Sequence, residues 1–459
     1  MRRLAALASI VVAGLCAGCG SNDGRSAPYR RFHSRPDLKP PPVRVLTPAH
    51  GTAPGYVFIA PKKNVVQVGP MIVDDRGRVV WFRPLNTRGV TDFRVQTYRG
   101  RPVLTWWRGR PFHGEGDGNY AIVDGSYRTV ARVRPRNGLV GDIHEFKLTR
   151  RGSALMTIFH RVRRGARTIF EGAVQEVDVA SGRVLFEWHS LGHVALAESY
   201  ERPPKKRSLP YDYFHVNSVE EDTDGNLLVS ARNTHAIYKL DRATGRILWR
   251  LGGKRSDFAM GRGTRFAWQH DARRLPDGTI SLFDNEAAPR VGRESRGLVL
   301  RLDLRRMRAT LVRSIVHRPP LLAATQGNLQ LLPNGNWFVG WGARPYFTEY
   351  DPSGRRVLFD ARFGDRADSY RAYRFPWVGR PGGRPAIAVA GRTAYASWNG
   401  ATELARWRLV VDGHAAPRSV ARTGFETALR IPRTATTITV RALDRDGRVL
   451  GTSKTLHVD

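Results

Sequence analysis

Polar residues that can do chemistry recur at a fixed distance before the turns of this sequence. Counting back eight residues from each of the turn glycines Gly152, Gly225, Gly278 and Gly335 gives His144, Asn217, His270 and Gly327. His215 stands two residues before Asn217, in the segment FHVNS. If these segments are structurally equivalent, their imidazole and amide groups converge on one site. The other histidines, His160 and His189 among them, share no such register.

Clustered imidazoles permit three kinds of chemistry: metal binding, proton transfer and nucleophilic catalysis. Asp142, Glu145 and Asp271 flank the histidines, but neighbouring residues on a strand point to opposite sides, so these carboxylates do not complete a metal site. A nucleophilic histidine needs cationic or amide donors for the anionic oxygens of its substrate. Arg232, at the end of NLLVSARN, is a candidate for that role. The residues alone leave all three chemistries open.

Two repeated phrases indicate the fold that positions these residues. One is a turn followed by a strand, as in LPDGTISLFDN at 275–285, and the other is a hairpin, as in IYKLDRATGRILWRLG at 237–252. The turn glycines Gly225, Gly278 and Gly335 lie 53 and 57 residues apart. Four short antiparallel strands repeating at about this spacing are typical of a β-propeller. We therefore predict an all-β chain with a six-bladed propeller over residues 46–365, and a β-sandwich is the alternative architecture.

The composition and residue pattern of the sequence change after the predicted propeller. Residues 366–388 are rich in Pro and Gly and predict a linker, whereas residues 389–459 alternate strands with turns. About 70 residues of this kind favour a small β-sandwich of the fibronectin or immunoglobulin type.

The N-terminus has the pattern of a secretory signal. MRRLAALASIVVAGLCAGC begins with two arginines and continues with a short apolar run and small residues. Its end resembles the lipobox of bacterial lipoproteins, with Cys19 as the lipidated residue. We therefore predict a signal peptide at 1–18, a flexible leader at 19–45, and a protein exported and lipid-anchored to the outer face of a bacterial cell membrane.

The formal net charge of +35 does not predict a nucleic-acid partner. The basic residues are spread along the chain without a cluster of five or more, and export removes the protein from the genome. The charge instead favours anionic substrates, because arginine matches planar oxyanions well. No Gly-rich loop for a nucleotide is present, and we expect no cofactor.

Five segments together resemble the arylsulfotransferase (aryl-sulfate sulfotransferase) family, in a lipoprotein branch. They are DIHEF, DYFHVNS, LLVSARNTHAIYKLDRATGRILWRLGG, QHDARRLPDGTISLFDN and QGNLQLLPNGNWFVGWG. The resemblance covers roughly residues 55–365. It implies a six-bladed propeller enzyme that transfers a sulfuryl group from a phenolic sulfate ester to a phenol, without a nucleotide donor.

The resemblance also implies roles for individual residues. His270 would be the nucleophile that carries the sulfuryl group, and His215 the proton carrier for the acceptor. His144, Asn217 and Arg232 would hold the sulfuryl oxygens. Asn328 and Thr325 would contact the substrate, although Thr325 lies outside the aligned register.

Two other functions compete with this one. The first is a non-catalytic, surface-anchored propeller that binds an anionic polymer or ligand. The second is a quinoprotein-like dehydrogenase, because LDRATGRILW resembles a phrase of pyrroloquinoline propellers, but that phrase occurs in full only once.

Overall fold

The computed structural model describes residues 27–112, 114–364 and 366–458. The predicted signal peptide and Cys19 lie outside these residues. The described chain is all-β, and its one helix is the 3-10 turn η1 (Leu196–Glu198). No helix within these ranges has the length and apolar character needed to cross a membrane.

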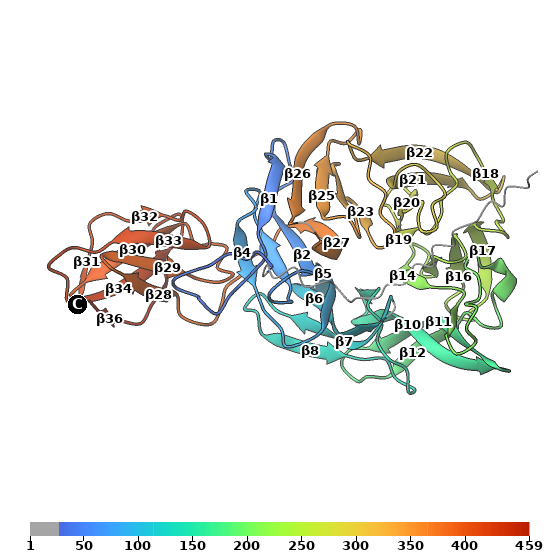
Figure 1. The fold of residues 1–459 in the computed structure, drawn as a ribbon, viewed down its shortest axis with the longest axis horizontal. Coiled ribbons are helices and arrows are strands. Elements are labelled where there is room, and N and C mark those ends of the chain that lie inside the picture. The colour runs from blue at the N-terminus through green and yellow to red at the C-terminus, as the bar shows by residue number, and fades with distance from the viewer. Residues whose placement is uncertain (1–26, 113, 365, 459) are drawn as a thin grey trace, which may run out of the picture.

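Between residues 43 and 375 the described chain forms six sheets of four or five strands, arranged around a common centre (Figure 1). From the centre outward, the first sheet contains β27 (Asp368–Phe375), β2 (Tyr56–Lys62), β3 (Met71–Val73) and β4 (Val79–Phe82). The second sheet contains β5 (Gly89–Tyr98), β6 (Arg101–Phe112), β7 (Glu115–Val123) and β8 (Thr129–Val133). The next two contain β9 (Phe146–Leu148), β10 (Ser153–Arg164), β11 (Arg167–Asp178) and β12 (Val184–His189), with β13 (Tyr211–Asp212) parallel to β11; and β14 (Val216–Glu221), β15 (Leu227–Ala231), β16 (Ala236–Leu240) and β17 (Ile247–Gly252). The last two contain β19 (His270–Arg274), β20 (Ile280–Asp284), β21 (Arg296–Asp303) and β22 (Arg308–Val316), with β18 (Ala259–Met260) parallel to β22; and β23 (Asn328–Leu331), β24 (Trp337–Gly340), β25 (Tyr346–Tyr350), β26 (Val357–Phe363) and β1 (Val43–Thr47). This is a propeller-like arrangement.

Both ends of this region close the ring. β27 is the innermost strand of the sheet that contains β2, and β1 is the outermost strand of the sheet that contains β26. A strand from the C-terminal end of the region thus completes the first sheet, and a strand from the N-terminal end completes the last sheet. This exchange of strands joins the two ends of the ring.

These two strands differ from the predicted boundaries. β27 falls in the range expected to be a Pro/Gly linker, and β1 starts within the expected flexible leader. The leader is also held farther upstream, where the Ser34 hydroxyl donates to the Ser397 hydroxyl at 2.7 Å. Residues 32–34 therefore lie against the C-terminal part of the chain.

Amide side chains form hydrogen bonds with backbone groups at the inner edges of the central strands. Asn328 on β23 donates from Nδ2 to the carbonyl of Ala372 at 2.8 Å, and its Oδ1 accepts from the N–H of Ala372 at 2.9 Å. Gln330 makes the same pair of bonds to the backbone of Arg374, both at 2.9 Å. Each amide thus acts like one residue of an adjacent strand, and it fixes β27 to the neighbouring sheet.

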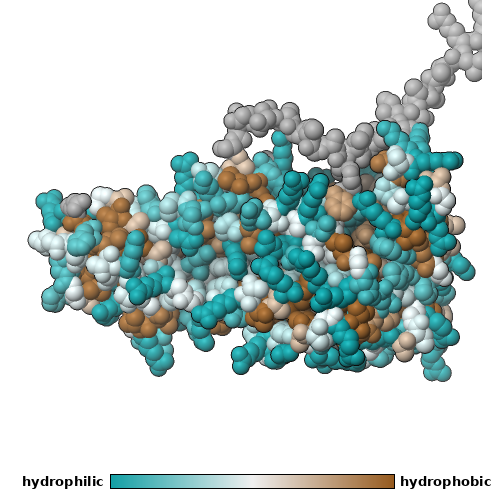
Figure 2. All heavy atoms as spheres, turned by 90° about the horizontal axis from the view of Figure 1, so that it is seen from below, coloured by the Kyte–Doolittle hydropathy of each residue, from teal (hydrophilic) through white to brown (hydrophobic). Residues whose placement is uncertain are grey.

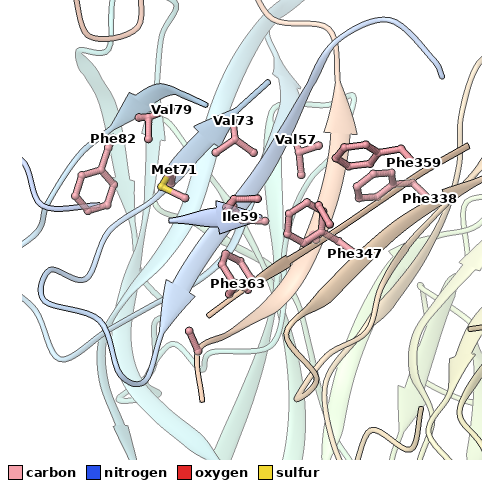
Figure 3. Close-up of a cluster of buried hydrophobic side chains, with 14 of the residues drawn as sticks. Val57, Ile59, Met71, Val73, Val79, Phe82, Phe338, Phe347, Phe359 and Phe363 are labelled. Atoms are coloured by element: carbon pink, nitrogen blue, oxygen red, sulfur yellow. The ribbon is translucent and has the colours of Figure 1, made fainter. Parts of the chain in front are cut away.

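Apolar side chains fill the space between neighbouring sheets. Figure 3 shows the contact between the last and first sheets, where phenylalanines face aliphatic side chains and methionine. The labelled members of this cluster are Phe338, Phe347, Phe359, Phe363, Val57, Ile59, Met71, Val73, Val79 and Phe82. The alternation of apolar residues along each strand produces these layers, because every second side chain faces the next sheet.

The turn glycines have the predicted conformation. Gly152, Gly225, Gly278 and Gly335 have φ of +79°, +82°, +82° and +85°. A Cβ at Gly225 or Gly278 would meet no atom within 4 Å, so the backbone conformation, and not crowding, requires glycine there.

Two further sheets follow the ring and lie to one side of it (Figure 1). The first contains β28 (Ala386–Ala390), β29 (Thr393–Ser397) and β33 (Glu426–Arg430). The second contains β31 (His414–Ala415), β30 (Arg406–Val411), β34 (Thr437–Leu443) and β35 (Val449–Thr452), with β32 (Val420–Ala421) and β36 (Leu456–His457). Asn399 attaches these sheets to the ring through two hydrogen bonds to the backbone of Phe82, at 2.8 and 3.0 Å.

Hydrophilic side chains cover most of the face shown in Figure 2, and hydrophobic residues appear there in separate small patches. Such a distribution is normal for a soluble surface.

We predict that Asn328→Ala lowers the free energy of unfolding by about 1–3 kcal/mol, because both backbone groups of Ala372 lose their buried partner. Urea unfolding followed by tryptophan fluorescence measures the change. Asn334→Ala, in an exposed turn of the same sheet, is the control and should cost clearly less. Equal losses in the two variants would contradict the edge role of Asn328.

Candidate functional site

His144, His215 and His270 converge at the centre of the ring. His144 precedes β9, His215 precedes β14, and His270 is the first residue of β19. One ring nitrogen from each lies within 4.8 Å of the other two. The ring centroids of His144 and His215 are 4.9 Å apart. Equal offsets from the turn glycines thus correspond to neighbouring positions in space.

Local backbone distortions aim these side chains. His215 and Asp271 have φ of +55° and +58°, in the left-handed region that non-glycine residues seldom adopt. The pairing of β19 with β20 shifts register between His270 and Arg273. Such bulges re-aim side chains at the ends of strands. Here His270 faces the other histidines, whereas Asp271 joins a separate ion-pair network.

The hydrogen bonds of His270 define its tautomer. Its Nδ1 lies 2.7 Å from Oδ1 of Asn285 and 3.1 Å from the carbonyl of Trp268, so Nδ1 carries the proton and donates. Nδ2 of Asn285 donates to the carbonyls of Ala323 and Gln326, which fixes the orientation of that amide. Nε2 of His270 accepts from the N–H of Gln326 at 3.2 Å. Nε2 therefore carries the lone pair of the ring, which in this structure is bonded to the N–H of Gln326.

A carboxylate holds each of the other two histidines. Nδ1 of His144 contacts Asp142, and Nδ1 of His215 contacts Asp212. Burial raises the pKa of the Asp212 carboxyl to about 7, against the opposing effects of Arg232 and His144. The Asp212–His215 pair can therefore gain or lose a proton near neutral pH.

The site disfavours positive charge on its imidazoles. Burial lowers the pKa of His270 well below its usual value, and the nearby Arg232 and His144 lower it further. Burial, His144 and Arg232 have the same effect on the pKa of His215. His270 is therefore neutral at ordinary pH. A positive potential of this kind also opposes a metal cation and favours an anion.

Arg232 is the source of this potential. Its side chain is buried and donates to Oδ1 of Asn233 at 2.8 Å and to the carbonyl of Ala288 at 3.1 Å. Its guanidinium lies over the ring of Trp268, 4.6 Å from the centroid. Within the described ranges no carboxylate pairs with Arg232, and its buried Nε has no hydrogen-bond partner. Burial lowers its pKa to about 10, so the group stays charged.

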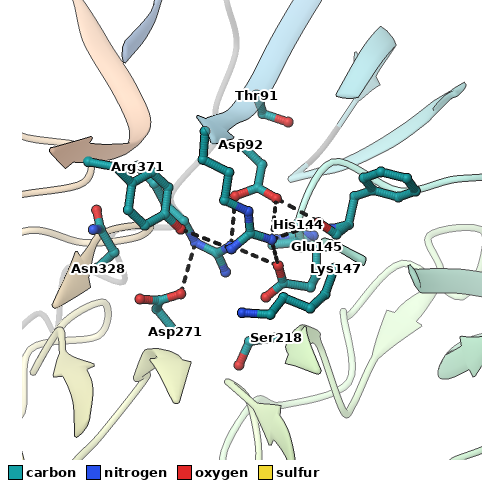
Figure 4. A network of polar contacts seen from close by, with 12 residues as sticks. Thr91, Asp92, His144, Glu145, Lys147, Ser218, Asp271, Asn328 and Arg371 are labelled. Carbon is teal, nitrogen blue, oxygen red and sulfur yellow. Dashed lines mark hydrogen bonds and ion pairs between the residues drawn. The ribbon is translucent and has the colours of Figure 1, made fainter. Parts of the chain in front are cut away.

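A second group of buried arginines is fully neutralised (Figure 4). Arg371 on β27 is fully buried and pairs with Asp92 at 2.9 Å, Glu145 at 3.3 Å and Asp271 at 3.4 Å. Arg94 and Arg273 also pair with Glu145. Although burial alone would raise the pKa of Glu145, the three arginines hold it below its usual range.

This network closes the centre of the ring on one side of the histidines. A cavity of about 970 Å³ has Arg94, Asp271, Arg273 and Tyr373 among its lining residues. The three arginines and three carboxylates of the network balance one another, whereas Arg99 and Arg150 add positive charge to the cavity lining.

The structure assigns different surroundings to the other predicted substrate ligands. Asn217 is buried and donates to the carbonyl of Gln269 at 2.7 Å, while its Oδ1 has no partner among the described residues. Thr325 is half-buried, precedes Gln326 and accepts from the side chain of Gln326 at 3.2 Å. Asn328 uses its amide in two hydrogen bonds to the backbone of Ala372, and its role in substrate binding stays a prediction.

Two residues of the site had no sequence signal. Tyr370 lies on β27 with its ring 5.5 Å from that of His144 and 6.4 Å from that of His270, and its buried hydroxyl has no partner in the described chain. Burial raises its pKa, so the hydroxyl keeps its proton. Glu115 is buried near Asp212 and Asp142. Burial and these two carboxylates raise its pKa to about 9, so it is neutral at pH 7.

Stacked rings connect Arg232 to a surface cavity. His235 packs edge-on against Trp268 at 4.3 Å and stacks on Tyr200 at 4.0 Å. Tyr200 lines a cavity of about 660 Å³, whose other lining residues include Tyr211, Arg167, Arg202 and Lys254. The rings of Tyr200, His235 and Trp268 thus form a row from this cavity to Arg232, and cationic side chains line the cavity.

We predict that Arg371→Met lowers the free energy of unfolding by about 3–5 kcal/mol, because it leaves buried carboxylates without their partner. Arg306→Met is the control, since Arg306 is 81% exposed and its pair with Asp303 should contribute less than about 1 kcal/mol. Denaturant titrations of both variants give the comparison. A loss for Arg371→Met no larger than that of the control would show that the network does not stabilise the ring.

Solved structures with a similar arrangement are distant in sequence. A protein of unknown function from Bacteroides caccae has 13% identity and a TM-score of 0.42, over 70% of this chain and 100% of that chain. A protein from Lactobacillus plantarum has 12% identity and a TM-score of 0.39, over 88% and 96%. Virginiamycin B lyase from Staphylococcus aureus has 10% identity and a TM-score of 0.35, over 78% and 96%. Similarity at this level carries no information on activity.

The family comparison is more specific. No curated protein sequence matches the chain significantly. The sequence profile described as arylsulfotransferase (ASST) matches residues 94–364, which is more than half of the chain and includes His144, His215, Arg232 and His270. The chain belongs to the arylsulfotransferase family.

Proposed function

We propose that the protein transfers a sulfuryl group from a phenolic sulfate ester to a phenolic acceptor, with His270 as the covalent carrier. The observation that carries this proposal is the lone pair on Nε2 of His270, beside two further imidazoles and an arginine without a counter-ion. A neutral nucleophile facing a cation suits a monoanionic sulfate ester.

In the first half-reaction, Nε2 of His270 gives up its hydrogen bond from the N–H of Gln326 and attacks sulfur, and the bond from sulfur to the aryl oxygen breaks. The phenolate leaves, and the new N–S bond makes a sulfohistidine. The proton on Nδ1 stays in its bonds to Asn285 and the carbonyl of Trp268, which stabilise the positive charge that the ring acquires.

Two groups are placed to hold the sulfuryl oxygens. Arg232 supplies charge and the free N–H at Nε. The buried hydroxyl of Tyr370, which has no partner in the described chain, adds a neutral donor. Preorganised donors that need no rearrangement are the main source of rate in such transfers.

In the second half-reaction, the acceptor phenol attacks sulfur and its proton passes to the Asp212–His215 pair. The N–S bond breaks and His270 is regenerated. The pair returns the proton to the next leaving phenolate, so one sulfate ester and one phenol give another sulfate ester and another phenol without net proton change.

The electrostatics favour this reaction over a metal centre at the same histidines. Three imidazole nitrogens within 4.8 Å, two of them backed by carboxylates, also fit a metal ion. Arg232, however, opposes a cation. Activity that disappears with a chelator and returns with zinc would reverse this preference.

We further propose that the six sheets are six propeller blades and that the last two sheets form a β-sandwich. An apolar core between those two sheets, which includes Ile387, Ala394, Trp407, Leu409 and Val440, supports the second part. We also propose export and lipid anchoring at Cys19, a proposal that rests on the N-terminal sequence pattern alone.

We predict that the purified protein releases 4-nitrophenolate from 4-nitrophenyl sulfate when phenol is present, and that His270→Ala slows release at least about 1,000-fold, since no other group replaces the nucleophile. Mass spectrometry of the quenched enzyme without acceptor should find one added SO₃ group on the peptide that contains His270. His193→Ala, at an exposed histidine, is the control. A folded wild-type protein with no turnover and no sulfated peptide would favour the non-catalytic binding function.

We predict that the rate of the second half-reaction rises with pH through about 7. Below this pH Asp212 is protonated and the pair cannot accept the proton of the phenol, whereas above it the carboxylate is free to do so. Asp212→Asn should remove this inflection and slow transfer to the acceptor by about 100-fold or more. Rapid-quench decay of the sulfated enzyme, measured from pH 5.5 to 8.5, tests both statements. An unchanged pH profile in Asp212→Asn would exclude this pair as the proton carrier.

A further inference from the structure

A second cluster of histidines and a carboxylate lies away from the catalytic histidines, on β10, β11 and β12. Nδ1 of His160 lies 2.8 Å from Oε1 of Glu171, and Nδ1 of His189 lies 2.9 Å from the same oxygen. One nitrogen from each histidine and one carboxylate oxygen lie within 4.8 Å of one another. Three potential metal ligands therefore already lie close together on the sheet.

The strand pairing explains why these residues meet. His160 on β10 stands directly opposite Glu171 on β11, and β11 pairs with β12 near His189. The residue before His160 is Phe159, which packs on His144 and His215 at 5.3 and 5.1 Å. Because successive side chains alternate in direction, the second cluster faces away from the catalytic histidines.

Further polar groups orient the ligands. Nε2 of His189 lies 3.0 Å from Oε1 of Glu187, and Oε2 of Glu187 accepts from Gln175 at 2.7 Å and from Asn137 at 2.8 Å. A histidine whose far nitrogen is bonded to a fixed carboxylate is the usual arrangement behind a metal-bound imidazole.

Charge and access both favour a cation. Glu171 is 4% exposed, whereas the side chains of His160 and His189 are 43% and 32% exposed. No lysine or arginine of the described chain pairs with Glu171. The two imidazoles are therefore the groups that pair with Glu171.

We propose that His160, Glu171 and His189 bind a divalent transition-metal ion, for which zinc is the best match. Two imidazoles and one carboxylate are a common zinc donor set and leave a fourth position for water on the exposed side. Ligands of a tetrahedral zinc stand roughly 3.4 Å apart, so the contacts of 2.8 and 2.9 Å between the imidazole nitrogens and Glu171 need to lengthen by about half an ångström. Coordination displaces the protons that the two Nδ1 atoms now share with Glu171, and solvent takes them up. The metal would cross-link three strands of one sheet.

Zinc titration of tag-free, chelator-treated protein by calorimetry tests this site. The wild-type protein should bind one equivalent that His160→Ala and Glu171→Gln each weaken by about 100-fold or more, and Glu187→Gln should weaken it by about 10–100-fold. His193→Ala, whose ring lies on the surface nearby, should bind zinc as the wild type does. Zinc should also raise the melting temperature of the wild type but not that of Glu171→Gln.

The same titration, carried out on His270→Ala, tests the zinc site separately from sulfuryl transfer. His270→Ala should retain the equivalent, because the two sites face opposite sides of β10. Loss of the equivalent in His270→Ala, or equal zinc binding in the wild type, His160→Ala and Glu171→Gln, would overturn the proposal.

Discussion

The buried guanidinium of Arg371 is the interaction on which the rest of the ring depends. It projects from β27 and contacts Asp92 of β5, Glu145 beside β9, Asp271 of β19 and, at 2.9 Å, the carbonyl of Asn217 on β14. One side chain thus ties five of the six sheets together at their centre. Asn328, on the sixth sheet, bonds to the residue that follows Arg371.

Burying this many charges is unfavourable unless each finds a partner, and the network meets that condition. The histidine cluster, on the other side of it, does not. Arg232 has no carboxylate within the described ranges, the hydroxyl of Tyr370 has no acceptor, and His270 is held neutral. The balanced network makes the ring rigid, and the unbalanced cluster leaves favourable interactions for a bound anion to complete.

Sequence reasoning located the candidate histidines because the fold repeats. Equal offsets from glycines of positive φ correspond to equal positions on successive innermost strands, so His144, Asn217 and His270 could be brought together without coordinates, and His215 with them because it lies two residues before Asn217. The same register could not show what each side chain binds. Asn328 has the right residue type near the right place, but its amide satisfies the edge of β27.

Other residues lay beyond the reach of this reasoning for topological reasons. Tyr370 belongs to a strand that pairs with β2, more than 300 positions earlier in the chain, and local composition around it indicated a linker. Glu115 belongs to a hairpin that carries no copy of the turn register. His160, Glu171 and His189 meet through cross-strand pairing, which has no signature in residue spacing.

The position of β27 in the chain also sets the order of events during biosynthesis. The strand that carries Tyr370 and Arg371 is the last of the ring to leave the ribosome, yet it is the innermost strand of the first sheet. The earlier sheets can form their hairpins as they emerge, but until residue 371 arrives Asp92, Glu145 and Asp271 have only Arg94 and Arg273 as partners. The histidine cluster therefore gains the hydroxyl of Tyr370 only when the whole ring closes.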